Sequence, residues 1–364
     1  MLVAFKIAAI EGDGIGPEIM AATKDVINQV AAVFNLNIEI DDVCAGGQSI
    51  DRYNTPLTEE NFQKCKDSNA ILLANIGAPQ YDNLPIEQRP ERVMYRLRGE
   101  LGLEVNVRPI FIPSSLRSCS PLKDEIVDEG FDVVVIRDVI GGELPSPKYR
   151  GKGSGGEEAY DKDYYNEKIV QRVANWAKKY AKLRKNNVVS LDKANGLASS
   201  ELWRKIMVRE LTAAKVDINS ILVDSGVQTF TKGVAAFDVI VAPNLFGDIV
   251  ADELTGLSGV GNLLPDATMG QGTFGMYEPN QLHNMNQKIV GKNIANPLGL
   301  IMAVSMMMEQ SLELPKAAKV IRQAVMNVVN RGYVPADLKT SETKMVLGTR
   351  EVTKMVCNEI KELS

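Results

Sequence analysis

The chain has 364 residues, of which 45% are hydrophobic and 24% are charged, and its formal net charge is −5. This composition is typical of globular proteins, and the length exceeds what one ordinary core needs, so two domains are expected. The negative charge argues against a general nucleic-acid binder, and no apolar run reaches the ~20 residues that span a bilayer.

Cysteine and histidine usage narrows the chemistry further. The four cysteines are scattered without paired spacing, which argues against a disulfide framework or a zinc site and suits a reducing cytoplasm. The N-terminus runs directly into an apolar strand, so no signal peptide is expected. His283 is the only histidine, which excludes Ser-His-Asp, Cys-His and multi-histidine metal chemistry.

Strands and helices alternate along the chain, which predicts an α/β protein. The apolar runs that we interpret as strands, each followed by a helical pattern, are 4–10, 70–74, 132–136, 187–191, 219–223 and 237–242. Residues 143–165 interrupt this alternation with a segment rich in Gly, Pro and charge that is too long for an ordinary connection. We interpret it as a flap, an oligomer-forming arm or a disordered insert.

A glycine-rich loop, residues 12–18, lies between the first strand and a helix. Its sequence is G-x-G-x-G-P and not the G-x-G-x-x-G of Rossmann domains. No acidic residue follows a second strand at the usual distance. Taken alone, the loop indicates a tight turn.

Arginines at strand or helix ends are candidates for binding a carboxylate substrate, and they are Arg98, Arg108 and Arg137. Arg137 closes an all-apolar strand, where burial of a guanidinium group without an anion is costly. Guanidinium groups bind carboxylates in a bidentate manner, so three of them indicate a di- or tricarboxylate. Any one of them is more often part of a surface ion pair.

Met94 and Tyr95 share one helical face with Glu91 and Arg98, because the four residues have the spacing i, i+3, i+4, i+7. Such a face either lines an apolar slot beside the arginine or packs into the core. If it lines a slot, it favours an alkyl group on the substrate.

Asp248 and Asp252 follow the strand 237–242 at the start of a helix. A separation of four places their Cβ atoms roughly 5–6 Å apart on one face, where unpaired carboxylates would repel. The pair therefore suits a hard divalent cation, although an arbitrary D-x-x-x-D is more often a solvated acidic face. Lys193, at the end of an earlier strand beside Asp192, is a candidate general base if nearby cations favour its neutral form; otherwise it is an ordinary strand-end lysine.

Together these motifs resemble the metal-dependent β-decarboxylating dehydrogenases of the isocitrate/isopropylmalate family over almost the whole chain. The segment GAPQYD…RPE favours the isopropylmalate branch over the isocitrate branch. The matching signatures, in order, are EGDGIGPEI (11–19), GAPQYDNLP…RPERVMYRLRGELGLEVNVRP (77–109), IRDVIGG (136–142), LDKANGLASSELWR (191–204), ILVDSG (221–226), FDVIVAPNLFGDIVADE (237–253), LLPDATMG (263–270), MYEP (276–279) and GKNIANP (291–297).

The resemblance implies roles for the candidates. The residues implied to hold Mg²⁺ or Mn²⁺ are Asp224, Asp248 and Asp252. The residues implied to bind a hydroxy-dicarboxylate substrate are Arg98, Arg108, Arg137, Met94 and Tyr95. Lys193 would take the proton of the substrate hydroxyl. In the family Lys193 and Asp224 reach across from the neighbouring subunit, which implies a homodimer with shared active sites.

The resemblance also implies a two-domain α/β fold with an NAD site that lacks Rossmann geometry. The residues implied to contact the cofactor are Gly14, Ile15, Glu278, Lys288, Ile289 and Asn296. The expected cofactor-binding domain comprises residues 1–105 plus 263–364. The expected substrate, metal and dimerisation domain comprises residues 106–262, with an arm at about 143–165.

The chain departs from the family pattern in three places. Leu144 stands where the family carries the tyrosine that protonates the enolate, and Tyr149, five residues on, is the candidate substitute. The family's His-Gly-Ser-Ala-Pro-Asp loop is replaced by residues 280–288, which are two residues longer. Lys288 stands where NAD-preferring members carry an aspartate, so a cation there favours NADP.

The expected reaction is oxidative decarboxylation of a 3-substituted malate in the cytoplasm, with NAD favoured over NADP. An alkyl-substituted malate is expected, because Met94 cannot hydrogen-bond the third carboxylate of isocitrate. The alternatives are isocitrate, homoisocitrate or another alkylmalate as the substrate, and a paralogue that binds such acids without turning them over.

Overall fold

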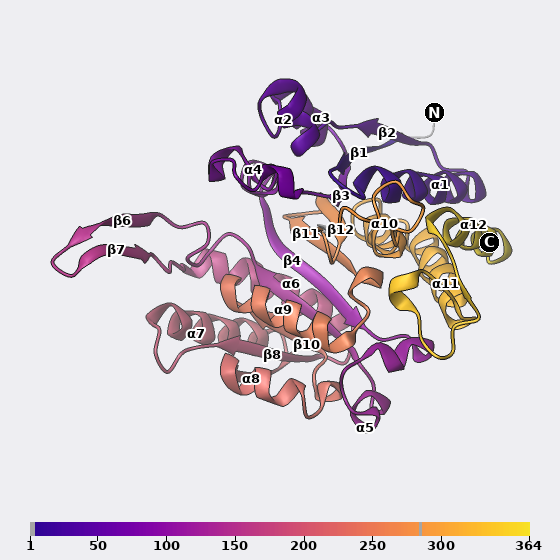
Figure 1. Ribbon diagram of the computed structural model, residues 1–364. Helices are drawn as coiled ribbons and strands as arrows, with labels where there is room; N and C mark the ends of the chain where they lie inside the picture. Colours follow the sequence, from indigo (N-terminus) through magenta and orange to yellow (C-terminus); the bar gives the residue numbers. More distant parts are fainter. Residues whose placement is uncertain (1–3, 284–285) are drawn as a thin grey trace. The chain divides into compact units, whose positions relative to one another are not determined.

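The computed structural model describes residues 4–283 and 286–364, so Asn284 and Met285 of the altered cofactor loop lie outside the described residues. The chain divides into two compact units. Unit 1 contains Met1–Leu103, Ile112–Ser120 and Gly259–Ser364, and unit 2 contains Glu104–Phe111 and Pro121–Ser258. Unit 1 is therefore built from both ends of the chain (Figure 1). Within the described ranges, every helix is too short or too polar to cross a membrane.

Unit 1 is built on a mostly parallel sheet with the strand order β2-β1-β3-β12-β11. β1 is parallel to β2 and β3, β3 is parallel to β12, and β12 is antiparallel to β11. All residues of β3, β11 and β12 are buried, as expected for strands that are covered on both faces. The strands are β1 (Phe5–Gly12), β2 (Ile38–Asp42), β3 (Ala70–Asn75), β11 (Pro265–Gly270) and β12 (Gly275–Pro279), with a separate short pair, β13 (Tyr333–Val334) and β14 (Met345–Val346).

Helices of unit 1 bury its sheet. α10 is apolar around its whole circumference, and each residue from Leu298 to Met308 is buried, which is the pattern of a helix inside a core. α1 and α11 pack against it, and α12 packs against α1 and α11. The helices are α1 (Gly16–Phe34), α2 (Gly47–Tyr53), α3 (Glu59–Lys66), α4 (Arg92–Glu100), α10 (Leu298–Gln310), α11 (Pro315–Asn330) and α12 (Thr349–Glu362).

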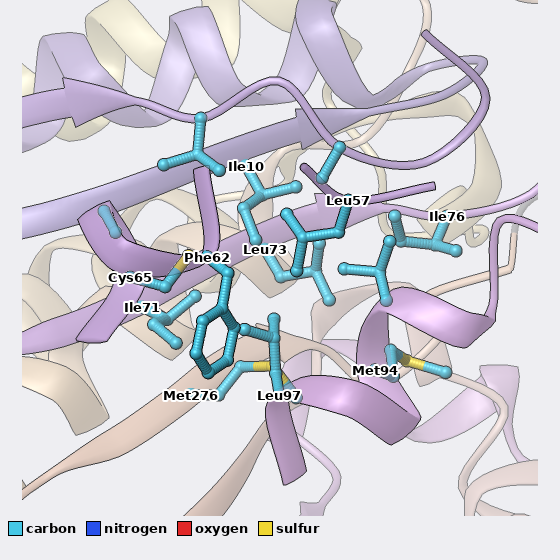
Figure 2. Close-up of a cluster of buried hydrophobic side chains, with 14 of the residues drawn as sticks. Ile10, Leu57, Phe62, Cys65, Ile71, Leu73, Ile76, Met94, Leu97 and Met276 are labelled. Carbon is cyan, nitrogen blue, oxygen red and sulfur yellow. The ribbon is translucent and has the colours of Figure 1, made fainter. Parts of the chain in front are cut away.

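A second apolar cluster of unit 1 joins β1 and β3 to α3 and α4 (Figure 2). Ile10 and Leu73 of the two strands belong to it, together with Phe62 of α3 and Leu97 of α4. Met94 of α4 is also a member and is only 7% exposed. The cluster therefore fixes α4, the helix that carries Arg98, against the sheet.

Unit 2 has a sheet with the strand order β4-β5-β10-β8-β9, in which β4 is antiparallel to β5 and the other pairs are parallel. Its strands are β4 (Leu103–Phe111), β5 (Asp132–Asp138), β8 (Asn187–Asp192), β9 (Asp217–Leu222) and β10 (Val239–Ala242). Its helices are α5 (Asp124–Asp128), α6 (Glu167–Leu183), α7 (Ala198–Ala213), α8 (Val223–Phe230) and α9 (Asn244–Ser258). The strands predicted from the apolar runs are present as β1, β3, β5, β8, β9 and β10, and the α/β fold is confirmed.

The segment between β5 and α6 forms an antiparallel hairpin of β6 (Lys148–Gly153) and β7 (Gly156–Asp161), which projects from the rest of unit 2 (Figure 1). All residues of β7 are exposed. Tyr149 and Tyr160 stack across the two strands, with 4.6 Å between their ring centroids. Residues 148–161 therefore form an ordered arm, and the segment 143–165 is not a disordered insert.

Candidate active site

The carboxyl end of β5 and the start of α9 bring together two arginines and two aspartates of unit 2. Arg137 ends the apolar part of β5 and is 7% exposed. Its Nη1 donates to Asp248 of α9. Arg108 on the adjacent strand β4 is 9% exposed, and its Nη1 donates to Asp252 at 2.7 Å. Two predicted substrate arginines, Arg108 and Arg137, and two of the predicted metal ligands, Asp248 and Asp252, thus lie in one cluster, where each charge balances another.

The Asp248–Asp252 pair has the donors that a divalent cation requires. The two carboxylates lie one turn apart on α9, and their side chains are 38% and 72% exposed, so solvent and ligands can reach them. Carboxylate oxygens are the preferred ligands of Mg²⁺ and Mn²⁺. Within the described residues, however, no group of three or more acidic, cysteine or histidine side chains of one chain could hold a metal ion. Asp224 therefore does not join Asp248 and Asp252 within a single chain.

Lys193 and Asp224 form a separate pair in unit 2. Lys193 follows β8, Asp224 lies in the first turn of α8, and Lys193 Nζ donates to Asp224 Oδ1 at 2.6 Å. That hydrogen bond lowers the pKa of Asp224. Both side chains are open to solvent, with exposed fractions of 35% and 54%. The pair is thus oriented toward solvent and not toward the core.

An ion pair between buried Asp192 and half-buried Arg204 holds the backbone on which Lys193 stands. Asp192 is fully buried and binds Arg204 of α7 through two hydrogen bonds of 2.7 and 2.8 Å. Its Oδ1 also accepts from the backbone N–H of Ala194 at 3.0 Å. A bidentate guanidinium–carboxylate pair has little freedom. The turn from β8 to α7 is therefore fixed on both sides of Lys193.

Asn244 and Gly247 allow the first turn of α9 to lie directly on Arg137. Asn244 Oδ1 accepts from Arg137 Nε and Nη2 at 3.1 and 2.9 Å, and its amide donates to the carbonyl of Gly141 at 2.9 Å. A Cβ atom on Gly247 would lie 2.9 and 2.8 Å from the Cβ and Cγ atoms of Arg137. Since real Cβ atoms essentially never approach so closely, only glycine fits there without moving the arginine.

Gly247→Ala is expected to raise the KM for the carboxylate substrate by about tenfold, because the new methyl group displaces the guanidinium of Arg137. The gain in helix propensity, about 1 kcal/mol, offsets part of the steric cost, so the melting temperature should change little. Steady-state kinetics and thermal melts measure the two effects.

Gly256→Ala is the matched control for Gly247→Ala, because Gly256 lies in the same helix and a Cβ atom there has nothing within 4 Å. It should leave the KM unchanged and stabilise α9. An equal rise in KM in both variants would show that the helix, and not the contact with Arg137, is sensitive to alanine.

Arg98, Met94 and Tyr95 lie on or beside α4 of unit 1, but they face different surroundings. Arg98 Nη2 donates to Glu278 Oε1 at 3.1 Å, and the Glu278 side chain is 3% exposed. Met94 is packed in the apolar cluster of Figure 2. Tyr95 is 57% exposed, with the Arg92 guanidinium 5.5 Å from its ring centre. Of the two alternatives for this helical face, packing into the core is correct for Met94, whereas Tyr95 is accessible to a ligand.

The predicted cofactor segments of unit 1 are joined by residues that the sequence analysis missed. Gly12 and Gly14 have φ of +67° and +58°, the left-handed region that glycine adopts most easily, which accounts for the tight turn. Asp13 between them is buried and accepts backbone N–H groups of Gly47 and Gly77 at 3.1 and 2.9 Å. Burial raises the pKa of this carboxyl group.

Glu18 links the first loop to the loop 291–297. Its Oε1 accepts from the backbone N–H of Ala295 at 3.1 Å and from the hydroxyl of Thr349, and its Oε2 accepts from the N–H of Asn293 at 3.4 Å. Neither Asp13 nor Glu18 stands out by type or spacing. The only available signal was their place in a loop that the family uses for its cofactor.

The other predicted cofactor residues of unit 1 are less closely grouped. Ile15 is 5% exposed and belongs to the core. Asn296 donates to Asp337 at 3.0 Å and accepts from the backbone N–H of Leu298 at the start of α10, so its side chain is already in use. Lys288 is exposed and Ile289 half-buried. Lys288 is thus available to a ligand.

Tyr165, which the sequence analysis did not single out, lies beside the Arg137 cluster, whereas Tyr149 stacks on Tyr160 in the exposed arm. The Tyr165 hydroxyl accepts from the backbone N–H of Asn244 at 2.8 Å. A lone tyrosine 79 residues before its partner carries no periodic signal in the sequence. The only signal for it in the sequence is the glycine pair 141–142, because a Cβ atom at either position would meet the ring of Tyr165.

Comparisons with known proteins agree along the whole chain. The sequence model of the family described as isocitrate/isopropylmalate dehydrogenase matches residues 6–356. The 3-isopropylmalate dehydrogenase of Clostridium acetobutylicum is 40% identical over 98% of this chain and 99% of its own length. Among solved structures, the isocitrate dehydrogenase of Methylococcus capsulatus superposes with a TM-score of 0.83 at 25% identity, over 98% of this chain and 99% of that one. A β-decarboxylating dehydrogenase of Thermococcus kodakarensis in its apo form gives a TM-score of 0.80 at 27% identity, over 98% and 96% of the two chains.

Proposed function

The chain belongs to the isocitrate/isopropylmalate dehydrogenase family, and from that premise we propose that it converts 3-isopropylmalate to 2-oxo-4-methylpentanoate in leucine biosynthesis. It is a β-decarboxylating dehydrogenase. The observation that carries the choice of substrate is the 40% identity, over 98% of the chain, to a relative named for 3-isopropylmalate.

Arg108 and Arg137 are the proposed ligands of the substrate carboxylates in unit 2. Both guanidinium groups already bind carboxylates, those of Asp252 and Asp248. A substrate dicarboxylate offers the same kind of acceptor, so the two side chains can bind it without large rearrangement. Arg98 of unit 1 stays the third predicted carboxylate ligand, and Tyr95 the predicted contact for the alkyl group. Met94 would contribute little to this alkyl contact, because its side chain is packed in the core.

Asp248 and Asp252 of one subunit, with Asp224 of another, would hold Mg²⁺ or Mn²⁺ through carboxylate oxygens. A cation held there would supply Lewis-acid polarisation of the substrate hydroxyl, and a bound nicotinamide would supply the hydride acceptor. Lys193 is the proposed base that receives the proton of the substrate hydroxyl, and Asp224 holds its Nζ. Arg137 keeps its carboxylate ligand oriented through its own bonds to Asn244.

A cytoplasmic homodimer with shared active sites is the proposed assembly. The separation of the described acidic residues into an Asp248–Asp252 pair and a Lys193–Asp224 pair supports it, since one chain does not gather the ligands of a complete metal site. Tyr149 of the arm stays the predicted donor of the final proton. NAD is the proposed cofactor, because Lys288 is a single exposed cation and a 2′-phosphate usually needs more than one.

Initial rates with 3-isopropylmalate, isocitrate and homoisocitrate, each with NAD⁺ and NADP⁺ in the presence of Mn²⁺, test the proposal. We expect kcat/KM to be highest with 3-isopropylmalate and NAD⁺, by about tenfold or more, which corresponds to about 1.4 kcal/mol. An alkyl group gains apolar contact with the Tyr95 ring, whereas a third carboxylate does not, which accounts for the direction.

Faster turnover of isocitrate would assign the chain to a different substrate within the same family. A tenfold preference for NADP⁺ would make Lys288 the better guide to the cofactor. Binding of Mn²⁺ and alkylmalate without formation of reduced cofactor would refute the proposed reaction.

A further inference from the structure

Tyr165 occupies a buried position between the substrate arginine and the strand that precedes Lys193. It follows the arm and is 8% exposed. Its ring packs edge-on against Trp203 of α7, with 5.5 Å between ring centroids and an interplanar angle of 78°. Trp203 Nε1 in turn donates to Ser190 of β8 at 3.1 Å. Packing against Trp203 thus fixes the ring of Tyr165 independently of any hydrogen bond of its hydroxyl.

The Tyr165 hydroxyl lies near both a backbone N–H donor and a carboxylate. It accepts from the backbone N–H of Asn244 at 2.8 Å, and it lies close to the carboxylate of Asp138, the residue after Arg137. Asp138 is fully buried, and it accepts from the backbone N–H of Gly141 at 2.7 Å. Burial and the nearby carboxylate of Asp138 raise the pKa of Tyr165 well above its usual range, so the phenol keeps its proton.

The hydrogen bond between Tyr165 and Asn244 lies at the N-terminal end of α9, the helix that carries Asp248 and Asp252. The first N–H groups of a helix have no partner within the helix. At Asn244 the partner is the Tyr165 hydroxyl, which holds this residue where its side chain can bind Arg137 through two hydrogen bonds. One phenol therefore touches both sides of the site, the end of β5 through Asp138 and the start of α9 through Asn244.

We propose that Tyr165 is a positioning residue, which sets the orientation of the Arg137 guanidinium by fixing Asn244 at the start of α9. The inference rests on the proposed function only in that Arg137 binds the substrate carboxylate. Tyr165 itself acts through other residues, because it is buried and its hydroxyl already binds the backbone N–H of Asn244. It differs in this respect from Tyr149, which is accessible on the arm.

Tyr165→Phe tests the inference, because it removes the hydroxyl and keeps the ring against Trp203. We expect the KM for 3-isopropylmalate to rise about tenfold while kcat changes less than about threefold, since Arg137 binds its carboxylate equally in the ground and transition states. Hydrogen–deuterium exchange should become about tenfold faster at the segment 243–247, because the N–H of Asn244 loses its acceptor. The exchange measurement needs no substrate.

Tyr180→Phe is the matched control, since it removes the hydroxyl of another buried tyrosine of unit 2, which lies beside Trp176 in α6. It should leave both the KM and the exchange of 243–247 unchanged. Asn244→Ala removes the link while keeping Tyr165, and should raise the KM by itself. The double variant Tyr165→Phe, Asn244→Ala should then have no higher KM than Asn244→Ala alone, because both changes break one chain of contacts.

Unchanged exchange at 243–247 in Tyr165→Phe overturns the inference whatever the substrate is. Faster exchange with an unchanged KM also overturns it, because Tyr165 would then only stabilise the fold. If Tyr165→Phe does not fold, an unchanged KM in Asn244→Ala overturns it. Failure of the wild type to turn over 3-isopropylmalate is a separate result, which refutes the proposed function. The same KM comparison is then made with the 3-substituted malate that the wild type does turn over. If the wild type turns over no 3-substituted malate, both the proposed function and this inference are overturned.

Discussion

Asp248→Asn is expected to lower turnover by about 10³-fold or more, because a bound cation contributes several kcal/mol of transition-state stabilisation and each 1.36 kcal/mol is a factor of ten. Asp248 lies on the exposed side of α9 and supplies a carboxylate that asparagine replaces with a neutral amide. The same change leaves Arg137, which is 7% exposed, with a weaker acceptor. Calorimetric titration with Mn²⁺ in the presence of substrate should show weaker binding in parallel with the loss of rate.

Glu253→Gln is the control for Asp248→Asn, because it removes a carboxylate from the same helix at a position outside the cluster. It should bind Mn²⁺ as the wild type does. A thermal melt of each variant separates lost stability from lost chemistry. Unchanged Mn²⁺ affinity in Asp248→Asn and in Asp252→Asn would show that the two aspartates do not bind the metal and serve only as ion-pair partners of Arg137 and Arg108.

Lys193→Met is expected to lower turnover by roughly 10²–10⁴, the usual contribution of a positioned base. When Lys193→Met chains and Asp248→Asn chains are co-expressed, hybrid dimers form. The mixture should recover about a quarter of the wild-type activity, because half of the dimers are hybrids and each hybrid has one intact site. This recovery requires that Lys193 act on the Asp248 of the other chain. Co-expression with two affinity tags allows the hybrids to be purified, and the purified hybrids should then reach about half of the wild-type activity.

Lys193→Met mixed with Asp224→Asn is the matched negative control. These two residues form one pair within a chain, 2.6 Å between Nζ and Oδ1, so both defects fall in the half-site that one subunit contributes. Such hybrids should recover nothing. Recovery in neither mixture would place Lys193 and Asp248 of the same chain in one site, and the shared-site proposal would be abandoned.

Those parts of the fold and site that depend on local pattern could be predicted from the sequence. Apolar runs identify the strands because burial on both faces demands them, and a strand end identifies Arg137 as a buried cation. A spacing of four placed Asp248 and Asp252 on one face of α9, as the structure has them. Periodicity could not decide whether the face that includes Met94 lines a slot or packs into the core. The structure places Met94 in the core.

The residues that could not be predicted are those whose role depends on a single distant partner. Gly247 matters because of the atoms of Arg137 above it, and Tyr165 because of the N–H of a residue 79 positions later. Asp13 and Glu18 collect backbone N–H groups from loops far along the chain. Such contacts leave no repeat or spacing in the sequence, since they arise only when strands and helices have packed.

The division of unit 1 between the two ends of the chain has a consequence for biosynthesis. β3 is buried along its whole length and lies between β1 and β12, yet β12 follows it by about 200 residues, which takes ~10–40 s to translate. During that interval the nascent chain exposes an apolar strand edge that nothing covers, while the middle segment can already fold. We therefore expect the N-terminal hundred residues to be prone to aggregation until β12 has been made, and a fragment that ends before β12 to aggregate more readily than the full chain.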